Sequence, residues 1–267
     1  LGFEAAPSKQ SSDYPRWEKR LYAKLKQLLG TDLIHEKNAA SLNRIEKSSA
    51  TSPSLPLPNS IRINHGAKAK YIWTLGSSLG GPEAVKEFLD ALPRGLPVAF
   101  VYGQHIDAQF VPVLAKVLAR HAHFKLTVAS EGMSLHNGEV VIVPADKEVQ
   151  FIAGSVKVCD HEWPGPYGPS VDQLIVNVQR AYKSSGVIIF SGMGNDGAEA
   201  VQSLTKIAKE NTMQIWAQSS ESCASAAMPD ASRETGAVNF SGTPRELAEH
   251  LVSYIQLQEN KYQHAQA

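Results

Sequence analysis

The sequence predicts an α/β fold, a doubly wound and mostly parallel sheet flanked by helices, with an antiparallel edge or a hairpin insertion. Short apolar or β-branched runs alternate with helix-like segments along most of the chain, as in parallel sheets covered by helices. Polar residues follow several of these runs, where open α/β sheets collect functional groups. The middle of the chain has short apolar runs separated by turn residues, which is typical of hairpins.

Length and composition limit the kind of protein this is. A chain of 267 residues suits either one sizeable domain or a domain with an appendage. Its 26 basic and 26 acidic side chains balance, which argues against nucleic acid as a partner. No apolar stretch approaches the roughly 20 residues of a membrane span, and no secretory leader is recognisable. We therefore expect a cytoplasmic protein without membrane insertion, in which Cys159 and Cys223 are reduced.

Composition divides the chain into four segments. Residues 1–37 carry a basic amphipathic helix at 14–29, which is either the remnant of an upstream domain or a separate docking segment. Residues 38–68 are rich in Ser and Pro and predict a linker. Residues 69–260 predict the folded domain, and 261–267 a short tail.

The elements of that domain follow from local patterns, in chain order. Two strand–helix units come first, then short strands of hairpin character, then two further strand–helix pairs and a final helix with a capping box. Strands are predicted at 71–76, 98–103, 124–130, 138–145, 148–153, 155–160, 186–192 and 214–219, and helices at 82–92, 110–118, 170–182, 197–210 and from 243 onward.

Three loops at predicted strand ends carry unusual polar residues. The stretch "GSSLG" (76–80) fits G-x-S-x-G, a sharp turn that exposes the central serine, Ser78. His105 ends the second strand, and Asp196 follows the strand at 186–192. Serine needs a base to become a nucleophile, and an imidazole base needs a carboxylate that orients it. Ser78 would attack, His105 would carry the proton and Asp196 would orient His105.

The developing negative charge on a substrate oxygen requires backbone donors. The N–H of Leu79, at a helix N-terminus, and one from the glycine-flanked loop 192–197 could supply them. Each residue also has a structural interpretation: the glycine turn could serve packing alone, His105 could be an ordinary hydrogen-bonded histidine, and Asp196 could be a helix N-cap. Ser77 is the rival nucleophile.

Two other enzyme classes fit less well. A dinucleotide site also uses a glycine turn between strand and helix. However, G-x-G-x-x-G is absent at 76–81 and the second strand has no acidic residue at its end. The chain order Ser, His, Asp also differs from the Ser, Asp, His order of the α/β-hydrolases.

The motifs together resemble the catalytic domain of the bacterial chemotaxis protein-glutamate methylesterase family. They are "LGSSLGG", "GQHID", "PADKEVQF", "GPSVDQL", "FSGMGNDGAEA" and "SCASAAMP", over roughly residues 70–255. The resemblance makes 69–260 a methylesterase-like catalytic domain. It implies hydrolysis of glutamate methyl esters, often with deamidation of glutamines, on the cytoplasmic helices of methyl-accepting chemoreceptors.

The resemblance also assigns residues and partners. It places the nucleophile on Ser78, the base on His105 and the acid on Asp196, and it sets Met193 beside the oxyanion site. A chemosensory histidine kinase is a further expected partner, and neither a metal nor an organic cofactor is implied. The family usually also carries a phospho-accepting receiver domain, for which residues 1–68 are too short.

Two positions depart from the family pattern. Leu79 stands where the family usually has threonine, and Gly168 where a basic residue commonly precedes Pro-Ser-Val-Asp. These departures favour an alternative, a catalytically weak receptor-binding scaffold of the same fold. An esterase or amidase acting on a non-receptor substrate is the third interpretation.

Overall fold

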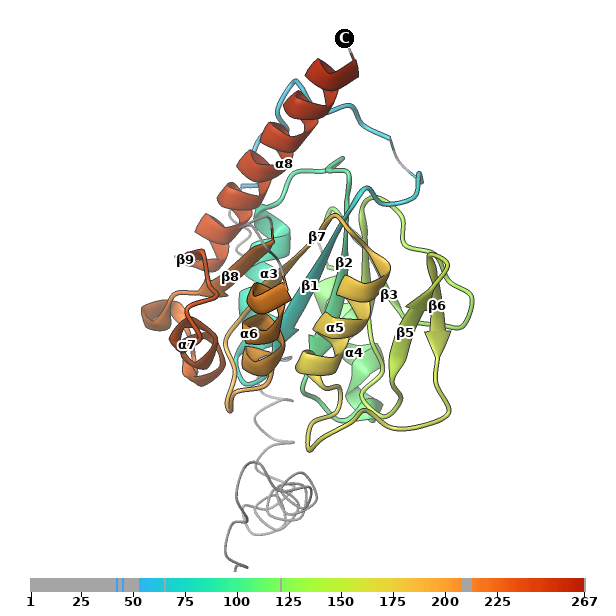
Figure 1. The fold of residues 1–267 in the computed structure, drawn as a ribbon, viewed down its shortest axis with the longest axis vertical. Coiled ribbons are helices and arrows are strands. Elements are labelled where there is room, and N and C mark those ends of the chain that lie inside the picture. Colours follow the sequence, from blue (N-terminus) through green and yellow to red (C-terminus); the bar gives the residue numbers. More distant parts are fainter. Residues whose placement is uncertain are drawn as a thin grey trace, which may run out of the picture.

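The computed structural model describes residues 42, 45, 53–64, 66–120, 122–207 and 213–266. The predicted helix at 14–29 lies outside them. Among these residues, one sheet has the strand order β3-β4-β2-β1-β7-β8-β9, and its neighbouring strands all run parallel. Helices cover both faces of this sheet (Figure 1). The predicted doubly wound α/β fold is therefore confirmed.

The predicted strands and helices occur in the predicted order along the chain. The strands of the sheet are β1 (Tyr71–Ser77), β2 (Val98–Gln104), β3 (Lys125–Val128), β4 (Glu139–Ile142), β7 (Ser185–Ile189), β8 (Gln214–Gln218) and β9 (Phe240–Gly242). The helices are α3 (Gly81–Ala91), α4 (Val111–Leu118), α5 (Val171–Ala181), α6 (Ala198–Ile207), α7 (Ala227–Glu234) and α8 (Pro244–Gln266).

Side chains of each central strand alternate between two apolar layers. Trp73 and Phe100 pack with α3, α4 and α8 on one face, whereas Ile72 and Val101 pack with α5 on the other. All residues of β1 and β2 are buried. Both faces of these strands are covered, which explains why their sequences are almost continuously apolar and do not alternate with polar residues.

The middle of the chain corrects part of the prediction. Antiparallel pairing is right for β5 (Val149–Ile152) and β6 (Ser155–Val158), which form a separate two-stranded sheet. It is wrong for β3 and β4, which pair parallel with each other, as β4 does with β2. The turn residues around His136 are typical of a hairpin. In the structure, however, His136 bridges to Lys68, and the chain crosses from β3 to β4 without a helix.

Described residues before β1 pack against the domain. Leu42, Ile45 and Ile61 are buried in the core layer that contains α3 and α8, and the N–H of Leu55 donates to the carbonyl of Ala91 (2.8 Å). The linker boundaries remain a prediction, but parts of the segment 38–68 belong to the core.

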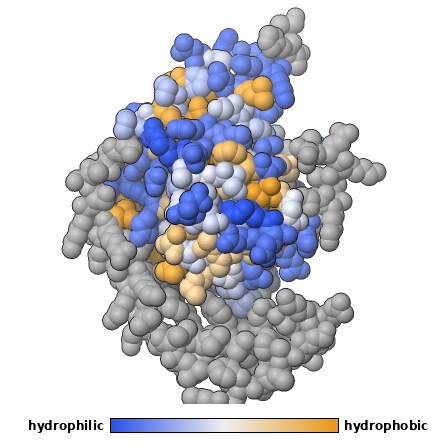
Figure 2. All heavy atoms as spheres, turned by 90° about the vertical axis from the view of Figure 1, so that its left-hand side faces the viewer, coloured by the Kyte–Doolittle hydropathy of each residue, from blue (hydrophilic) through white to orange (hydrophobic). Residues whose placement is uncertain are grey.

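The surface around the last elements is mostly hydrophilic. Figure 2 views the molecule from its α7 and β9 side, and apolar residues there form small separate groups. α8 begins with the predicted capping box: the N–H of Thr243 donates to the Glu246 carboxylate (2.8 Å), and the N–H of Glu246 to the Thr243 hydroxyl (3.3 Å). Within the described residues, no helix combines the length and apolarity needed to cross a membrane.

The sheet has a topological switch at β1, which lies between β2 and β7. After β1 the chain enters α3 on one face, and after β7 it enters α6 on the other. The loops after β1 and β7 therefore lead to opposite faces of the sheet, and the carboxyl ends of strands at such a switch point are where open α/β sheets bind ligands.

Candidate active site

Ser78 lies on a tight turn between β1 and α3. Gly80 has a φ of 75° and caps the helix, a conformation that favours glycine. A Cβ there would lie 2.4 Å from the Cβ of Ala224. The N–H of Ser78 donates to the carbonyl of Ser191 (3.0 Å), and its carbonyl accepts from the N–H of Gly81 (3.0 Å). The turn thus holds the serine at the carboxyl end of β1, half-buried.

The structure favours Ser78 over Ser77 as the nucleophile. Ser77 has no exposed surface. Its hydroxyl donates to the Gln104 carboxamide oxygen (2.5 Å) and contacts the Tyr102 hydroxyl (2.9 Å). A hydroxyl engaged in this way below the surface cannot reach a substrate.

His105 and Asp196 form a direct pair. The Nε2 atom of His105 lies 2.8 Å from Oδ2 of Asp196, with 9% and 1% of the two side chains exposed. The imidazole stacks on the Tyr167 ring, with centroids 4.7 Å apart and an interplanar angle of 3°. Gly194 permits this arrangement, since a Cβ there would lie 2.8 Å from the Tyr167 hydroxyl oxygen. Tyr167 therefore covers one face of His105.

Asp196 also caps a helix, but not the one that follows it. Its carboxylate accepts from the N–H groups of Val171 (2.7 Å) and Asp172 (2.9 Å) at the start of α5. Backbone donors at a helix N-terminus stabilise a buried carboxylate in its charged form. Capping and pairing with His105 therefore occur together, and the charge of Asp196 faces the imidazole.

Asp172 completes a reciprocal arrangement. Its carboxylate accepts from the N–H of Ala200 in α6 (2.7 Å), while Asp196, just before α6, caps α5. Burial and the neighbouring charge of Asp196 raise the pKa of Asp172 to about 7. The starts of α5 and α6 are thus locked together by two nearby carboxyl groups.

Backbone hydrogen bonds hold the loop after β7 against the residues just before α7 and against the first turn of α7. The N–H of Gly192 donates to the carbonyl of Ser225 (2.9 Å), and the N–H of Met228 donates to the carbonyl of Gly192 (3.0 Å). A Cβ on Gly192 would lie 2.2 Å from Sδ of Met228 and 2.9 Å from Cβ of Ser78. This loop therefore passes directly beside Ser78.

The two residues expected at the oxyanion site lie on these loops. Met193 is 59% exposed, and Leu79 is half-buried. The carbonyl of Leu79 accepts from the hydroxyl of Ser191 (2.7 Å), which links the turn at Ser78 to the loop after β7.

The three predicted triad residues are therefore brought to one rim. His105 and Asp196 are in contact, and Ser78 is adjacent through its backbone: the Gln104 carboxamide donates to the carbonyls of Ser78 (2.8 Å) and His105 (3.1 Å). Among the described residues, no hydrogen bond joins the Ser78 hydroxyl to the imidazole. Such bonds often tighten only when substrate is present.

Sequence reasoning missed three residues of this site: Gln104, Tyr167 and Asp172. A polar side chain at the end of an otherwise apolar strand was the available signal for Gln104. Only the folded loops bring Tyr167 and Asp172 to the site.

Gly168 has a steric reason to be glycine. A Cβ at this position would lie 2.4 Å from the backbone oxygen of Ala145. A basic side chain would therefore force these loops apart, so the departure noted in the sequence reflects their close approach.

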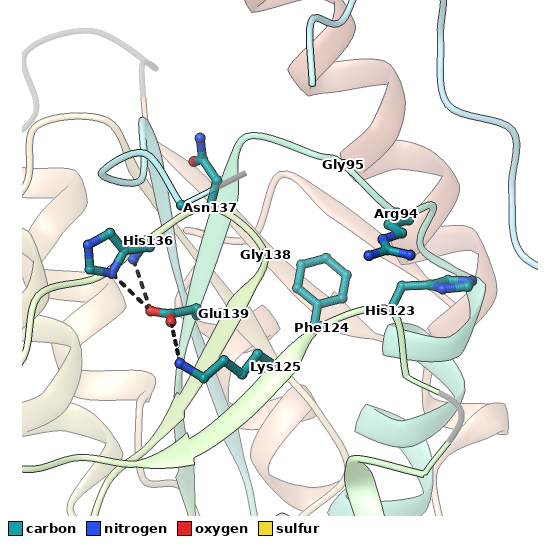
Figure 3. Close-up of a pocket in the computed structure, with 10 residues that line it drawn as sticks. Arg94, Gly95, His123, Phe124, Lys125, His136, Asn137, Gly138 and Glu139 are labelled. Carbon is teal, nitrogen blue, oxygen red and sulfur yellow. Dashed lines mark hydrogen bonds and ion pairs between the residues drawn. The ribbon is translucent and has the colours of Figure 1, made fainter. Parts of the chain in front are cut away.

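A cavity of about 440 Å³ lies away from this rim, where β3 and β4 begin (Figure 3). Its lining includes Arg94, His123, Lys125, His136 and Glu139. Glu139 is within 3.2 Å of Lys125 and 3.3 Å of His136. None of the predicted catalytic residues lines it.

Comparisons with known proteins give a consistent result. A protein-glutamate methylesterase/protein-glutamine glutaminase of Anaeromyxobacter dehalogenans is 32% identical over 184 residues, which cover 68% of this chain and 53% of that protein. The corresponding Bacillus subtilis protein is 29% identical, over 70% of this chain and 53% of its own length. The chain thus spans about half the length of these curated relatives.

The similarity extends to the fold. The CheB methylesterase catalytic domain of Thermotoga maritima superposes with a TM-score of 0.64 at 25% identity, covering 71% of this chain and 99% of that domain. The sequence model of CheB methylesterase matches residues 73–251, which include most of β1, all of β7 and the loops of the site. The chain therefore belongs to the CheB methylesterase family.

Proposed function

We propose that the chain is a serine hydrolase that removes methyl groups from glutamate methyl esters of chemoreceptor helices and deamidates glutamines there. The observation that carries the proposal is the His105–Asp196 pair, 2.8 Å apart, at the switch point where Ser78 begins its turn. The family and the names of its relatives support the substrate class. The site of action would be the cytoplasm, with a chemosensory histidine kinase as a further partner.

The pairing of Asp196 with Nε2 assigns a task to each nitrogen of His105. An ionised carboxylate only accepts hydrogen bonds, so Nε2, which lies 2.8 Å from Asp196, carries the proton of this bond. Nδ1 is then the atom that takes the Ser78 proton. Oγ of Ser78 then bonds to the ester carbonyl carbon, and the Leu79 N–H with a donor beside Met193 stabilises the oxygen anion. When the tetrahedral intermediate collapses, the carbon–methoxy bond breaks and Nδ1 returns the proton, which releases methanol.

Water completes the reaction in a second step. It attacks the acyl carbon while Nδ1 of His105 accepts one of its protons, and the bond to Oγ breaks as that proton passes to Ser78. The receptor leaves with an unmodified glutamate side chain. A glutamine substrate follows the same course, with ammonia released in place of methanol. Throughout, Asp196 stabilises the imidazolium and is not itself protonated.

The test is methanol release from a purified, methylated receptor cytoplasmic domain. We expect Ser78→Ala to lower the rate by more than about 1,000-fold, because it removes the attacking oxygen. Ser253→Ala is the matched control, since this exposed α8 hydroxyl only bonds to a carbonyl within its own helix. Unchanged methanol release in Ser78→Ala would refute the mechanism.

The scaffold alternative rests on Leu79, which replaces a hydroxyl that the family usually has beside the nucleophile. It predicts receptor binding without measurable turnover in the wild type. Incubation with a panel of small esters in parallel tests the remaining interpretation, a non-receptor substrate. Turnover of small esters without any methanol release from receptor would favour that interpretation.

A further inference from the structure

A buried polar cluster lies directly beneath the catalytic rim. It consists of Ser77, Tyr102 and Gln104, with 0%, 0% and 1% of their surfaces exposed. These residues occupy the ends of β1 and β2, whose other side chains are mainly apolar. Burying polar groups costs free energy unless each finds a partner, so such a cluster calls for a physical reason.

The Gln104 carboxamide uses its whole hydrogen-bonding capacity. Its oxygen accepts from the hydroxyls of Ser77 (2.5 Å) and Tyr102 (2.6 Å). Its nitrogen donates to the carbonyls of Ser78 (2.8 Å) and His105 (3.1 Å). An amide has two acceptor and two donor positions, so the two hydroxyls fix the amide in one orientation, with its protons toward the rim.

The two bonded carbonyls lie where the strand ladder stops. Ser77 and Gln104 are the last paired residues of β1 and β2, and the N–H of His105 still donates to the carbonyl of Ser77 (3.0 Å). Beyond this point the N–H of Ser78 does not bond to β2 but donates to the carbonyl of Ser191. The Gln104 side chain therefore takes the place of the next hydrogen bond between β1 and β2, and it links the backbone of Ser78 to that of His105.

Two neighbours are adapted to the cluster. A Cβ on Gly81 would lie 2.2 Å from Oγ of Ser77 and 2.7 Å from Oε1 of Gln104, so glycine leaves the space that the cluster fills. Burial raises the pKa of Tyr102. The phenol therefore keeps its proton at neutral pH and remains a donor.

We propose that Gln104 is a positioning residue, which holds the Ser78 turn and His105 at a fixed separation by bridging their carbonyl groups. The inference rests on the proposed function and deepens it. The distance between nucleophile and base limits proton transfer, and a displacement of about 1 Å costs about 100-fold in rate. The cluster thus acts through the two catalytic residues and touches no substrate itself.

The experiment compares Gln104→Glu, Gln104→Leu and Tyr102→Phe in the full chain, with methanol release as the activity. Glu has nearly the same shape but presents oxygen atoms to both carbonyls, and Leu removes all the bonds. We expect kcat to fall about 100-fold in both, with KM changed less than about 3-fold because substrate contacts persist. Tyr102→Phe removes one hydroxyl that orients the amide, so its kcat should fall by less than that of Gln104→Leu.

Asn177→Leu is the matched control. Asn177 is another buried amide, which donates to the carbonyl of Val149 (2.9 Å) and to Glu148 (2.9 Å) at the small sheet. We expect this variant to unfold at a lower denaturant concentration while the folded protein keeps its kcat. A loss of kcat in the Gln104 variants alone therefore cannot be a general effect of deleting a buried amide.

Two outcomes separate this inference from the proposed function. If Ser78→Ala abolishes turnover while folded Gln104→Leu and Tyr102→Phe keep the wild-type kcat, the positioning role is refuted and the esterase stands. If Ser78→Ala retains turnover, the esterase mechanism is refuted and the positioning role with it. Rates of Ser78 phosphonylation by a fluorophosphonate, with release of fluoride, should follow the same order as kcat, because this step needs the same serine and base.

Discussion

Asp196 has two structural roles that a single substitution can separate. It accepts from the first N–H groups of α5 and also contacts Nε2 of His105. A carboxylate used only as a cap would stabilise the fold and leave the imidazole free to rotate. One that faces both groups couples the orientation of the base to the position of α5.

Asp196→Asn tests this coupling. The amide keeps one acceptor but turns its NH₂ toward either the α5 N–H groups or the imidazole N–H. We expect kcat to fall by about 10⁴-fold, as when a triad acid is replaced by its amide and the histidine tautomer is wrong. The free energy of unfolding should also fall by about 1–3 kcal/mol, because a buried donor loses its partner. Methanol release and urea denaturation measure the two effects.

Glu199→Gln is the control for that substitution. Glu199 lies in the first turn of α6, close to Asp196 in the sequence, but is exposed, so its loss should change neither quantity appreciably. A folded Asp196→Asn variant that is less stable yet fully active would mean that Asp196 is only a helix cap.

Asp172 predicts a pH dependence of stability. Its pKa in the folded chain is raised to about 7 from the ordinary value of 3.8, first by burial and then by the charge of Asp196. The native state therefore binds more protons than the unfolded chain between these values. Its contribution to stability is complete below about pH 4 and is lost as the pH rises toward 7, by at most about 1.4 kcal/mol per pH unit.

The variant Asp172→Asn should remove this slope. Its amide oxygen can still accept from the N–H of Ala200, so the contact between α5 and α6 is retained in neutral form. We expect urea denaturation at pH 5 and pH 8 to show a smaller decline in the free energy of unfolding for Asp172→Asn than for the wild type. An equal decline in the variant and the wild type would mean that Asp172 is not the cause of this pH dependence.

Elements with a strong local signal were predictable, and those defined by distant contacts were not. The buried strands β1 and β2 and the capping box of α8 were evident in the sequence. α7 buries only Met228, Pro229 and Ser232, too few for a recognisable apolar face, and β9 is three residues long. Parallel pairing of β3 with β4 depends on a crossing connection that the local turn residues do not reveal.

Gly76 in β1 provides a test at the level of packing between elements. A Cβ there would lie 2.4 Å from Cγ1 of Val171 at the start of α5, the residue whose N–H donates to Asp196. We expect Gly76→Ala to lower the free energy of unfolding by about 1–3 kcal/mol through overpacking. It should also lower kcat, because α5 must shift together with the Asp196 contact.

Val171→Ala offers the compensating change for Gly76→Ala. It removes the methyl group that the new Cβ would meet. The double variant should be less destabilised than the sum of the single variants, with a coupling of about 0.5–3 kcal/mol in a double-mutant cycle. Additive losses would show that Gly76 is not constrained by α5.

At the scale of the whole molecule, the site depends on the strand order of the sheet. Serine, histidine and aspartate could be selected from the sequence because each follows a strand, and parallel strands end at one edge. The sequence assigned the acid to Asp196 but did not reveal Asp172 beside it, since the exchange of caps between these two residues depends on how α5 and α6 pack. It also left Gln104 unassigned, because the role of a side chain beneath the rim depends on the register of β1 with β2.

The domain also includes residues that the sequence assigned to a linker. Leu42 and Ile45 are 4% and 7% exposed and belong to the core layer with α3 and α8, whereas Ile63, from the same predicted linker, is 57% exposed. A linker that merely connects two bodies would contribute nothing to the stability of the domain. Buried side chains predict instead that this segment and the sheet unfold together.

Leu42→Ala and Ile45→Ala should each lower the free energy of unfolding by about 2–5 kcal/mol, the range for large-to-small substitutions in a core. Ile63→Ala makes the same kind of deletion at an exposed position and should stay within about 0.5 kcal/mol of the wild type. Urea denaturation followed by tryptophan fluorescence is a suitable measurement, because Trp73 and Trp216 lie in the same core layer. If all three variants match the wild type, residues 42 and 45 rest on the domain without stabilising it, and the core ends with the segment that begins at residue 53.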